Sequence, residues 1–93
     1  MAFYFRCLDK PNATELRMAN RDAHLAYLEQ FEDKIVAVGP IQNDAQDGMI
    51  GSLLIMNFDT RDEADAFAAG DPYAKAGLFE SVDIAPWKQV YPK

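Results

Sequence analysis

The sequence has very few of the side chains that build disulfides and metal sites. It is 93 residues long and contains one cysteine, Cys7, and one histidine, His24. A single cysteine cannot form an internal disulfide, and one cysteine with one histidine cannot supply the ligands of a zinc site. We therefore expect no metal and no disulfide, which fits a reducing compartment.

Basic residues and long apolar runs are also scarce. Nine Lys and Arg residues against 15 Asp and Glu residues give a net charge of −6, which repels phosphate backbones. No apolar run approaches the roughly 18 residues of a membrane span, and residues 1–6 have none of the regions of a signal peptide. We expect a soluble, cytoplasmic protein without a nucleic-acid or membrane partner.

What is present is the composition of a folded domain. Hydrophobic residues make up 49% and charged residues 26% of the chain, which is ordinary for a globular protein. The length fits one domain, residues 1–93, with a single core. Because the sequence has neither a glycine-rich phosphate loop nor a dinucleotide fingerprint, we expect no cofactor.

Four segments have the pattern of strands. Their apolar residues alternate with polar ones or form short continuous runs rich in branched side chains, and turn residues separate them. The predicted strands cover residues 2–8, 34–41, 50–58 and 79–91, and Pro86 interrupts the last.

Helices are predicted between these strands. The first covers residues 14–33, where apolar side chains recur at helical spacing. The residues of this apolar face are Leu16, Ala19, Ala23, Tyr27 and Phe31. A capping box that begins at Thr60 starts a helix that runs to Gly70. Asp71, which precedes a proline, predicts the cap of a short helix over residues 73–77.

The order of these elements, βαββαβ, predicts a ferredoxin-like α+β fold. In this fold a four-stranded antiparallel sheet has its helices on one face. Two strands contain consecutive apolar residues, Ile35 to Val38 and Leu53 to Met56, so both faces of the sheet require burial. Since an uncovered apolar sheet promotes aggregation, we expect a homodimer in which two sheets pack together.

His24 is the first candidate for chemistry. On a helical wheel it lies between Phe31 and Leu28, which directs it inward, and Arg17 and Arg21 lie on the same side. Two cations beside an imidazole favour a neutral base and attract an anionic ligand. The alternatives are a buried histidine with a structural role and arginines that pair with surface carboxylates.

Asp71 is the candidate partner of His24. As the residue before Pro72 it caps a helix, and that role alone would explain its presence. A carboxylate has two oxygens, so one could cap the helix while the other accepts the imidazole N–H. Asp71 would then fix the tautomer of His24 and leave the other ring nitrogen free to take a proton from a substrate.

Ser52 and Gly39 are candidates for contacts with a ligand. Gly39 precedes Pro40 near the end of the second predicted strand, and Ser52 follows Gly51 early in the third. Glycine permits close approach of a ligand or another backbone, and serine can donate a hydrogen bond to a substrate oxygen. Turn and bulge chemistry is the alternative. No nucleophile-elbow motif surrounds Ser52, so a Ser-His-Asp nucleophilic mechanism ranks low.

The order and spacing of these residues are similar to those of a known family. The matching segments run over nearly the whole chain, and they are Asp9-Lys10-Pro11, Arg17, His24, Val38-Gly39-Pro40, Gly51-Ser52, Glu63-Ala64, Asp71-Pro72-Tyr73, Ala76-Gly77-Leu78-Phe79 and Pro86-Trp87. Together they resemble the YciI-like (YCII-related) family. The resemblance implies a ferredoxin-like subunit that dimerises sheet to sheet as a dimeric α/β barrel. It also implies a pocket in which His24 and Asp71 form a pair, with Arg17, Gly39 and Ser52 nearby, and cofactor-independent chemistry on small molecules, such as elimination from chlorinated aromatic diols.

Two hypotheses about function follow. In the first, the protein is an enzyme in which His24 is a general base, Asp71 orients it, and Arg17 with Ser52 holds a developing oxyanion. Arg21 would add to the substrate-binding site. In the second, the same pocket binds a small anionic or phenolic ligand without catalysis. A histidine with only a structural role is a third interpretation.

Overall fold

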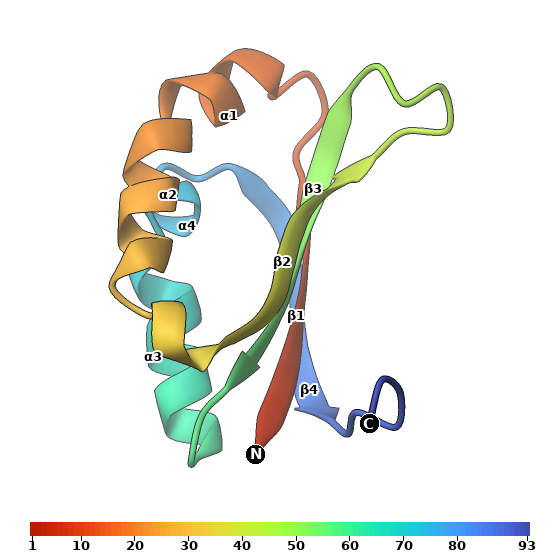
Figure 1. Cartoon of the computed structure of the whole chain (residues 1–93). Coiled ribbons are helices and arrows are strands. Elements are labelled where there is room, and N and C mark those ends of the chain that lie inside the picture. Colours follow the sequence, from red (N-terminus) through yellow and green to blue (C-terminus); the bar gives the residue numbers. More distant parts are fainter.

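The computed structural model describes residues 1–93 and shows a four-stranded sheet with helices on one face (Figure 1). No helix is long and apolar enough to cross a membrane. The elements in chain order are β1 (Ala2–Asp9), α1 (Thr14–Ala19), α2 (Arg21–Glu29), the 3₁₀ turn η1 (Glu32–Lys34), β2 (Ile35–Gln42), β3 (Met49–Asn57), α3 (Arg61–Gly70), α4 (Pro72–Lys75) and β4 (Phe79–Trp87).

The strand order across the sheet is β2-β3-β1-β4, and every neighbouring pair is antiparallel. This is the predicted ferredoxin-like α+β fold, and it is the fold of a subunit of a dimeric α/β barrel. At the centre of the sheet, Phe5 of β1 stands opposite Leu54 of β3 on one side and Ile84 of β4 on the other. Residues that are distant in the sequence therefore meet on the helix-covered face.

The apolar core fills the layer between the sheet and α3. Strand alternation points Phe3, Phe5 and Cys7 of β1 toward the helices, and all three side chains are buried. Phe67 of α3 packs against Phe5 with ring centroids 5.4 Å apart. The side chain of Thr60 accepts a hydrogen bond from the backbone N–H three residues later, so the predicted cap that starts α3 is confirmed.

The prediction of one helix over residues 14–33 is wrong. The chain forms two helices, and Asn20 lies between them with φ −109° and ψ 4°, outside the helical region. The Asn20 side chain donates a hydrogen bond to the carbonyl of Leu16 at 2.9 Å. An asparagine side chain that bonds nearby backbone competes with helix propagation, which explains the break.

The buried face of the first helical region also differs from the predicted one. Leu16, Ala19 and Ala23 of the predicted apolar face are exposed, whereas Arg17 and His24 are each 5% exposed. The predicted face holds only for the second half, where Tyr27 and Phe31 pack on the core. Polar side chains thus replace aliphatic ones at this end of the layer.

Pro86 does not interrupt β4, and the strand ends at Trp87 rather than at residue 91. Pro86 stands opposite Phe3 of β1. Because β4 is an edge strand, only one of its two sides pairs with another strand. A proline is tolerated in such a strand because the N–H that it lacks is not needed on the unpaired side.

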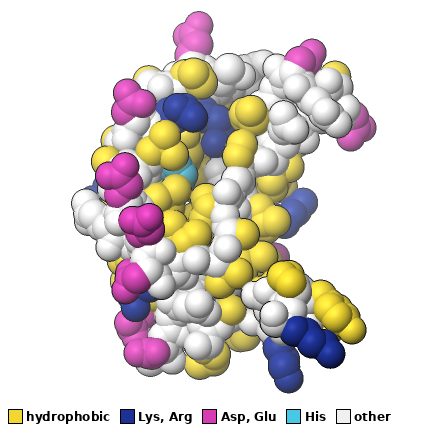
Figure 2. Space-filling view, in the orientation of Figure 1, with side chains coloured by type: hydrophobic (Ala, Val, Ile, Leu, Met, Phe, Trp, Pro, Cys, Tyr) yellow, Lys and Arg dark blue, Asp and Glu magenta, His cyan; other side chains and the backbone are white.

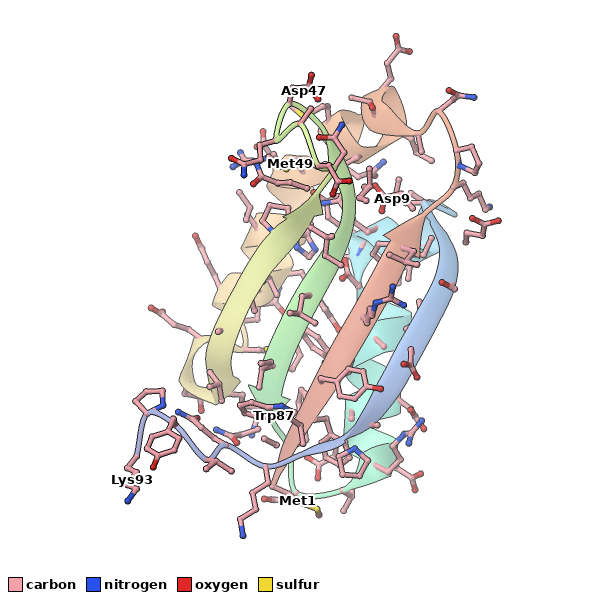
Figure 3. The ribbon with its side chains drawn as sticks, turned by 90° about the vertical axis from the view of Figure 1, so that its right-hand side faces the viewer. Met1, Asp9, Asp47, Met49, Trp87 and Lys93 are labelled. Carbon is pink, nitrogen blue, oxygen red and sulfur yellow. The ribbon has the colours of Figure 1, made fainter.

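The second face of the sheet carries no helix (Figure 3). Leu53 of β3 is 42% exposed on this face, and the neighbouring Ile55 is only partly buried. Val36 of β2 is 37% exposed. Of the consecutive apolar residues that predicted burial on both faces, those on the face without helices are therefore partly exposed to water in one chain.

Candidate functional site

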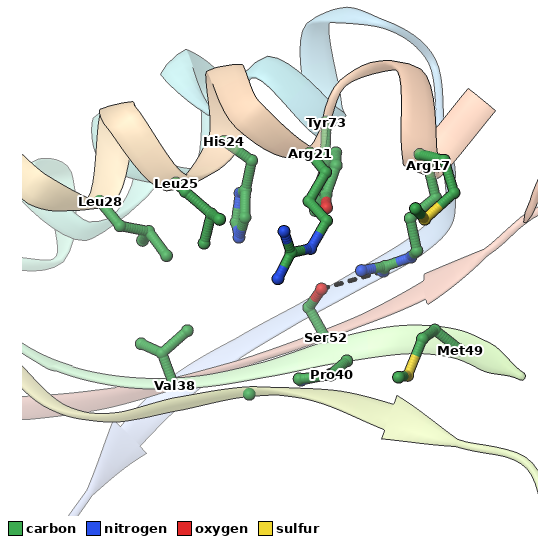
Figure 4. Close-up of a pocket in the computed structure, with 12 residues that line it drawn as sticks. Arg17, Arg21, His24, Leu25, Leu28, Val38, Pro40, Met49, Ser52 and Tyr73 are labelled. Carbon is green, nitrogen blue, oxygen red and sulfur yellow. Dashed lines mark hydrogen bonds between the residues drawn. The ribbon is translucent and has the colours of Figure 1, made fainter. Parts of the chain in front are cut away.

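A cavity of about 350 Å³ lies between α1 and α2 on one side and β2 and β3 on the other. This volume is at the lower end of the range for small-molecule pockets. Figure 2 shows the hollow with arginine and histidine side chains at its base and apolar side chains around it. The lining residues are Arg17, Met18, Arg21, His24, Leu25, Leu28, Val38, Gly39, Pro40, Met49, Ser52 and Tyr73 (Figure 4).

His24 and Asp71 meet behind this cavity. Nδ1 of His24 lies 2.9 Å from Oδ1 of Asp71, and both side chains are almost fully buried. The same Oδ1 accepts the backbone N–H of Tyr73 at 2.9 Å, which caps α4. The predicted division of labour between the two oxygens of Asp71 is therefore wrong, because one oxygen accepts both hydrogen bonds.

This arrangement orients the imidazole. A carboxylate only accepts hydrogen bonds, so Nδ1 of His24 carries a hydrogen and donates this hydrogen bond to Oδ1 of Asp71. The ring of Tyr73 stacks on the imidazole with centroids 4.0 Å apart and an angle of 15° between the planes. Nε2 is the ring nitrogen left without a protein partner, and the ring extends toward the cavity (Figure 4).

Arg17 is held from three sides. Its Nε and Nη2 donate to the two oxygens of Asp9 at 2.7 and 2.9 Å, and Nη2 also donates to Oγ of Ser52 at 2.9 Å. Its guanidinium lies over the ring of Tyr73, 4.7 Å from the centroid. Burial lowers the pKa of Arg17, but the hydrogen bonds and charge of Asp9 together with Tyr73 outweigh that effect, and the pKa is raised overall. Arg17 is thus a cation whose charge is matched by a buried carboxylate.

Arg21 lines the same cavity without such a match. Its side chain is exposed, and no carboxylate lies within ion-pair distance of it. Figure 4 shows its guanidinium in the middle of the cavity, between His24 and Arg17. The two predicted cations therefore have different environments.

Ser52 and Gly39 both reach the cavity, but in different ways. Ser52 is 2% exposed and its hydroxyl accepts from Arg17, so its own hydrogen is available to a ligand. The preceding Gly51 is required by the sheet, since a Cβ there would collide with the backbone carbonyl of Cys7. At Gly39 a Cβ would meet nothing within 4 Å, so no other part of this chain approaches it closely, and the close approach of a ligand stays a prediction.

Tyr73 and Asp9 belong to the site but are not among the candidate residues that the sequence predicts, although both stand in segments that match the family. Tyr73 is 2% exposed and contacts both His24 and Arg17. Burial raises its pKa more than the charge of Arg17 lowers it, so the phenol is protonated at neutral pH. Its place two residues after the predicted cap, Asp71, is the feature of the sequence that puts Tyr73 near the site. No local pattern marks Asp9 as a site residue, because its partner Arg17 lies on another element.

Cys7 has no place in this chemistry. Its thiol is buried under the sheet, and burial together with the charge of Asp71 raises its pKa to about 12. A thiol that stays protonated is a poor nucleophile. No group of three or more His, Cys, Asp or Glu side chains is arranged to hold a metal ion.

The sequence and the fold both match known proteins. The family model described as the YCII-related domain matches residues 1–88. The chain belongs to the YciI-like family. Protein YciI from Escherichia coli is 35% identical to it, and the match covers 98% of this chain and all of that protein.

Solved structures extend the comparison to geometry. A 5-chloro-2-hydroxyhydroquinone dehydrochlorinase from Burkholderia phenoliruptrix, in complex with 2,5-dihydroxybenzoquinone, superimposes with a TM-score of 0.91 and 38% identity. The superposition covers 95% of this chain and 94% of that protein. A putative antibiotic biosynthesis monooxygenase from Nitrosomonas europaea, at 17% identity and a TM-score of 0.56 over 98% of this chain and 90% of that protein, shares the fold.

Proposed function

We propose that this YciI-like protein is a cofactor-independent enzyme that removes a proton from a small hydroxylated aromatic or enolic compound and eliminates a leaving group from it. One observation carries the proposal. The His24–Asp71 pair fixes a proton on Nδ1 and leaves Nε2 facing a cavity of small-molecule size. That is the geometry a general base requires.

The reaction can be written with its bonds balanced. Nε2 of His24 takes the proton of an acidic O–H or C–H, and the electron pair of that bond forms a new double bond in the substrate. The leaving group departs with its own electron pair as an anion. Asp71 stabilises the imidazolium that results, and the proton then passes to solvent. Such base catalysis contributes typically ~10² to 10⁴ in rate, which suits an activated substrate.

Ser52 is the proposed donor to the substrate, and Arg17 acts through it. The guanidinium of Arg17 is occupied by Asp9 and by Oγ of Ser52. Since Ser52 accepts from Arg17, its hydrogen is directed to another acceptor, and the cavity offers a substrate oxygen that place. Arg17 is then a positioning residue for the developing oxyanion rather than a direct ligand of it.

The comparison with the dehydrochlorinase supports this class of substrate. That protein shares 38% of its residues with this chain over nearly the full length, and its structure contains a small dihydroxylated quinone. The cavity of this chain has the volume for one such ring.

The test uses the single histidine as its own reporter. In the wild-type chain, nitrogen NMR of His24 should show the hydrogen on Nδ1 and a bare Nε2. Asp71→Asn should disturb that tautomer. Turnover of halogenated hydroquinones should fall about 10²- to 10⁴-fold in His24→Gln. Loss of turnover with retained binding of the same compounds supports the enzyme.

Other outcomes would sink the proposal. If the wild-type protein binds hydroquinones but converts none of a panel of phenols, enols and lactones, it is a binding module. If His24→Gln lowers only the melting temperature and leaves binding and turnover intact, the histidine is structural.

We further propose that two copies pair through the uncovered face of the sheet. Leu53, Ile55 and Val36 give this face an apolar surface that one chain leaves partly open to water. Sedimentation of the wild-type chain should give a dimer, and Leu53→Lys should shift it toward the monomer. A monomeric wild-type protein at micromolar concentration would contradict this pairing.

A further inference from the structure

The two arginines that line the cavity are not paired alike. Arg17 faces Asp9, and His24 faces Asp71, so each of these positions has a carboxylate of its own. Arg21 has none, although the chain as a whole carries a net charge of −6. Arg21 is therefore a guanidinium without a carboxylate partner in a cavity whose other walls are largely apolar.

Tyr73 adds a second donor at the same place. Its phenol lies beside Arg17, and the charge of Arg21 also acts on it. Burial has the larger effect and raises the pKa of Tyr73, so its hydroxyl keeps its hydrogen and can donate it. Figure 4 shows the Tyr73 hydroxyl and the Arg21 guanidinium on the same side of the cavity, opposite Ser52.

We propose that Arg21 and Tyr73 form an oxyanion subsite that binds the ligand in its ionised form, as a phenolate or an enolate. The inference deepens the proposed function and depends on it for the identity of the reacting proton. The subsite holds one ionised oxygen of the ligand, while a second acidic O–H or C–H faces Nε2 of His24. This division assigns the charge recognition to Arg21 alone, whereas the hypothesis from the sequence shares it between Arg17 and Arg21.

The physical reason is the difference between the two arginines. A guanidinium that already donates to both oxygens of Asp9 gains little from a second anion. The Arg21 guanidinium has no carboxylate partner, so it gains a charge-assisted hydrogen bond when an anionic ligand enters the cavity. A neutral phenol offers neither group this gain.

The experiment uses 4-nitrophenol, whose ionised form absorbs visible light and whose neutral form does not. At a pH at which both forms are abundant, adding the wild-type protein should increase the ionised fraction of the probe. Arg21→Gln should weaken binding of the phenolate about 10- to 100-fold and leave binding of the neutral phenol unchanged. Tyr73→Phe should weaken phenolate binding about 2- to 10-fold.

Two control variants separate the possible causes. Arg61→Gln makes the same change in net charge on α3, where Arg61 pairs with Asp65 at the surface, and it should leave the preference for phenolate intact. His24→Gln should also leave this preference intact while it lowers turnover about 10²- to 10⁴-fold. The subsite can therefore fail independently of the proposed reaction.

Three results would overturn the subsite. The first is a wild-type protein that binds phenol and phenolate equally, or neither at millimolar concentration. The second is an unchanged preference in a folded Arg21→Gln variant. The third is a loss of preference in Arg61→Gln equal to that in Arg21→Gln, which would mean that net charge alone decides the affinity.

Discussion

The layer between the helices and the sheet is filled by different kinds of side chain at its two ends. At one end Phe5 packs edge to face on Phe58 and on Phe67, and those two rings are tilted relative to each other, with centroids 5.4 to 6.2 Å apart. At the other end Arg17 and His24 occupy equally buried positions and are held by carboxylates. The first end stabilises the chain through removal of apolar surface from water. At the second end hydrogen bonds hold the polar groups in place, and each adds only a little to the free energy of unfolding. These polar groups are the ones available for chemistry.

The largest effect on stability is expected at the apolar end. Phe67→Ala should lower the free energy of unfolding by about 3 to 5 kcal/mol, because Phe67 is 3% exposed and its removal leaves a cavity among other aromatic rings. Urea denaturation measures the change. Asp65→Ala, an exposed position on the same helix, should change it by less than about 0.5 kcal/mol. A loss below 1 kcal/mol in Phe67→Ala would mean that this end does not dominate the fold.

The next effect is expected where the polar end depends on a matched pair. Asp9→Asn leaves the buried guanidinium of Arg17 without a carboxylate and should lower the free energy of unfolding by about 3 kcal/mol. The double variant Asp9→Asn with Arg17→Met removes both charges and should recover part of that loss. If the double variant is as unstable as the sum of its parts, the cost comes from packing and not from an unpaired charge.

A smaller effect on stability is expected at Asp71, where structure and chemistry separate. Asparagine caps a helix about as well as aspartate, so Asp71→Asn should lower the free energy of unfolding by only about 1 kcal/mol. Asp71→Ala also removes the cap and should lower it by about 1 kcal/mol more. Thermal unfolding of both variants checks the order. An Asp71→Asn variant that unfolds as easily as Phe67→Ala would show that Asp71 is mainly structural.

The smallest effect is expected at Cys7, which lies between the two ends. Burial raises the pKa of its thiol from 9.0 to about 12, so at pH 10 the thiol of the native chain is protonated while that of the unfolded chain is ionised. The native state binds the thiol proton more tightly than the unfolded chain does. The stability that this adds is fully present below pH 9 and is lost as the pH rises toward 12. Iodoacetamide should alkylate the native protein at pH 10 only as fast as the chain opens. Alkylation as fast as in urea would contradict the burial.

Local patterns predicted the features that neighbouring residues decide. The alternation of β1, the cap at Thr60 and the cap at Asp71 all follow from residues within a few positions of one another. The inward direction of His24 followed from helical spacing over a single turn. These predictions are confirmed because hydrogen bonds and side-chain directions at this range depend little on the rest of the chain.

Predictions over longer segments failed where the local sequence was compatible with more than one structure. The helix over residues 14–33 breaks at Asn20, and Arg17 rather than Leu16 is the buried residue of its first part. Nothing in the periodicity distinguishes an arginine that pairs in the core from one that extends into solvent. The decision came from Asp9, which β1 places beside Arg17.

The sequence by itself determined the fold class, the family and the inward position of the only histidine, because composition, periodicity and caps are properties of short segments. The tertiary structure alone decided that one oxygen of Asp71 serves both His24 and the cap, that Tyr73 contacts both His24 and Arg17, and that Arg21 is the unpaired charge of the cavity. These facts depend on which side chains from four separate elements meet at one point. Such meetings are fixed by packing and by distance, and no local pattern encodes them.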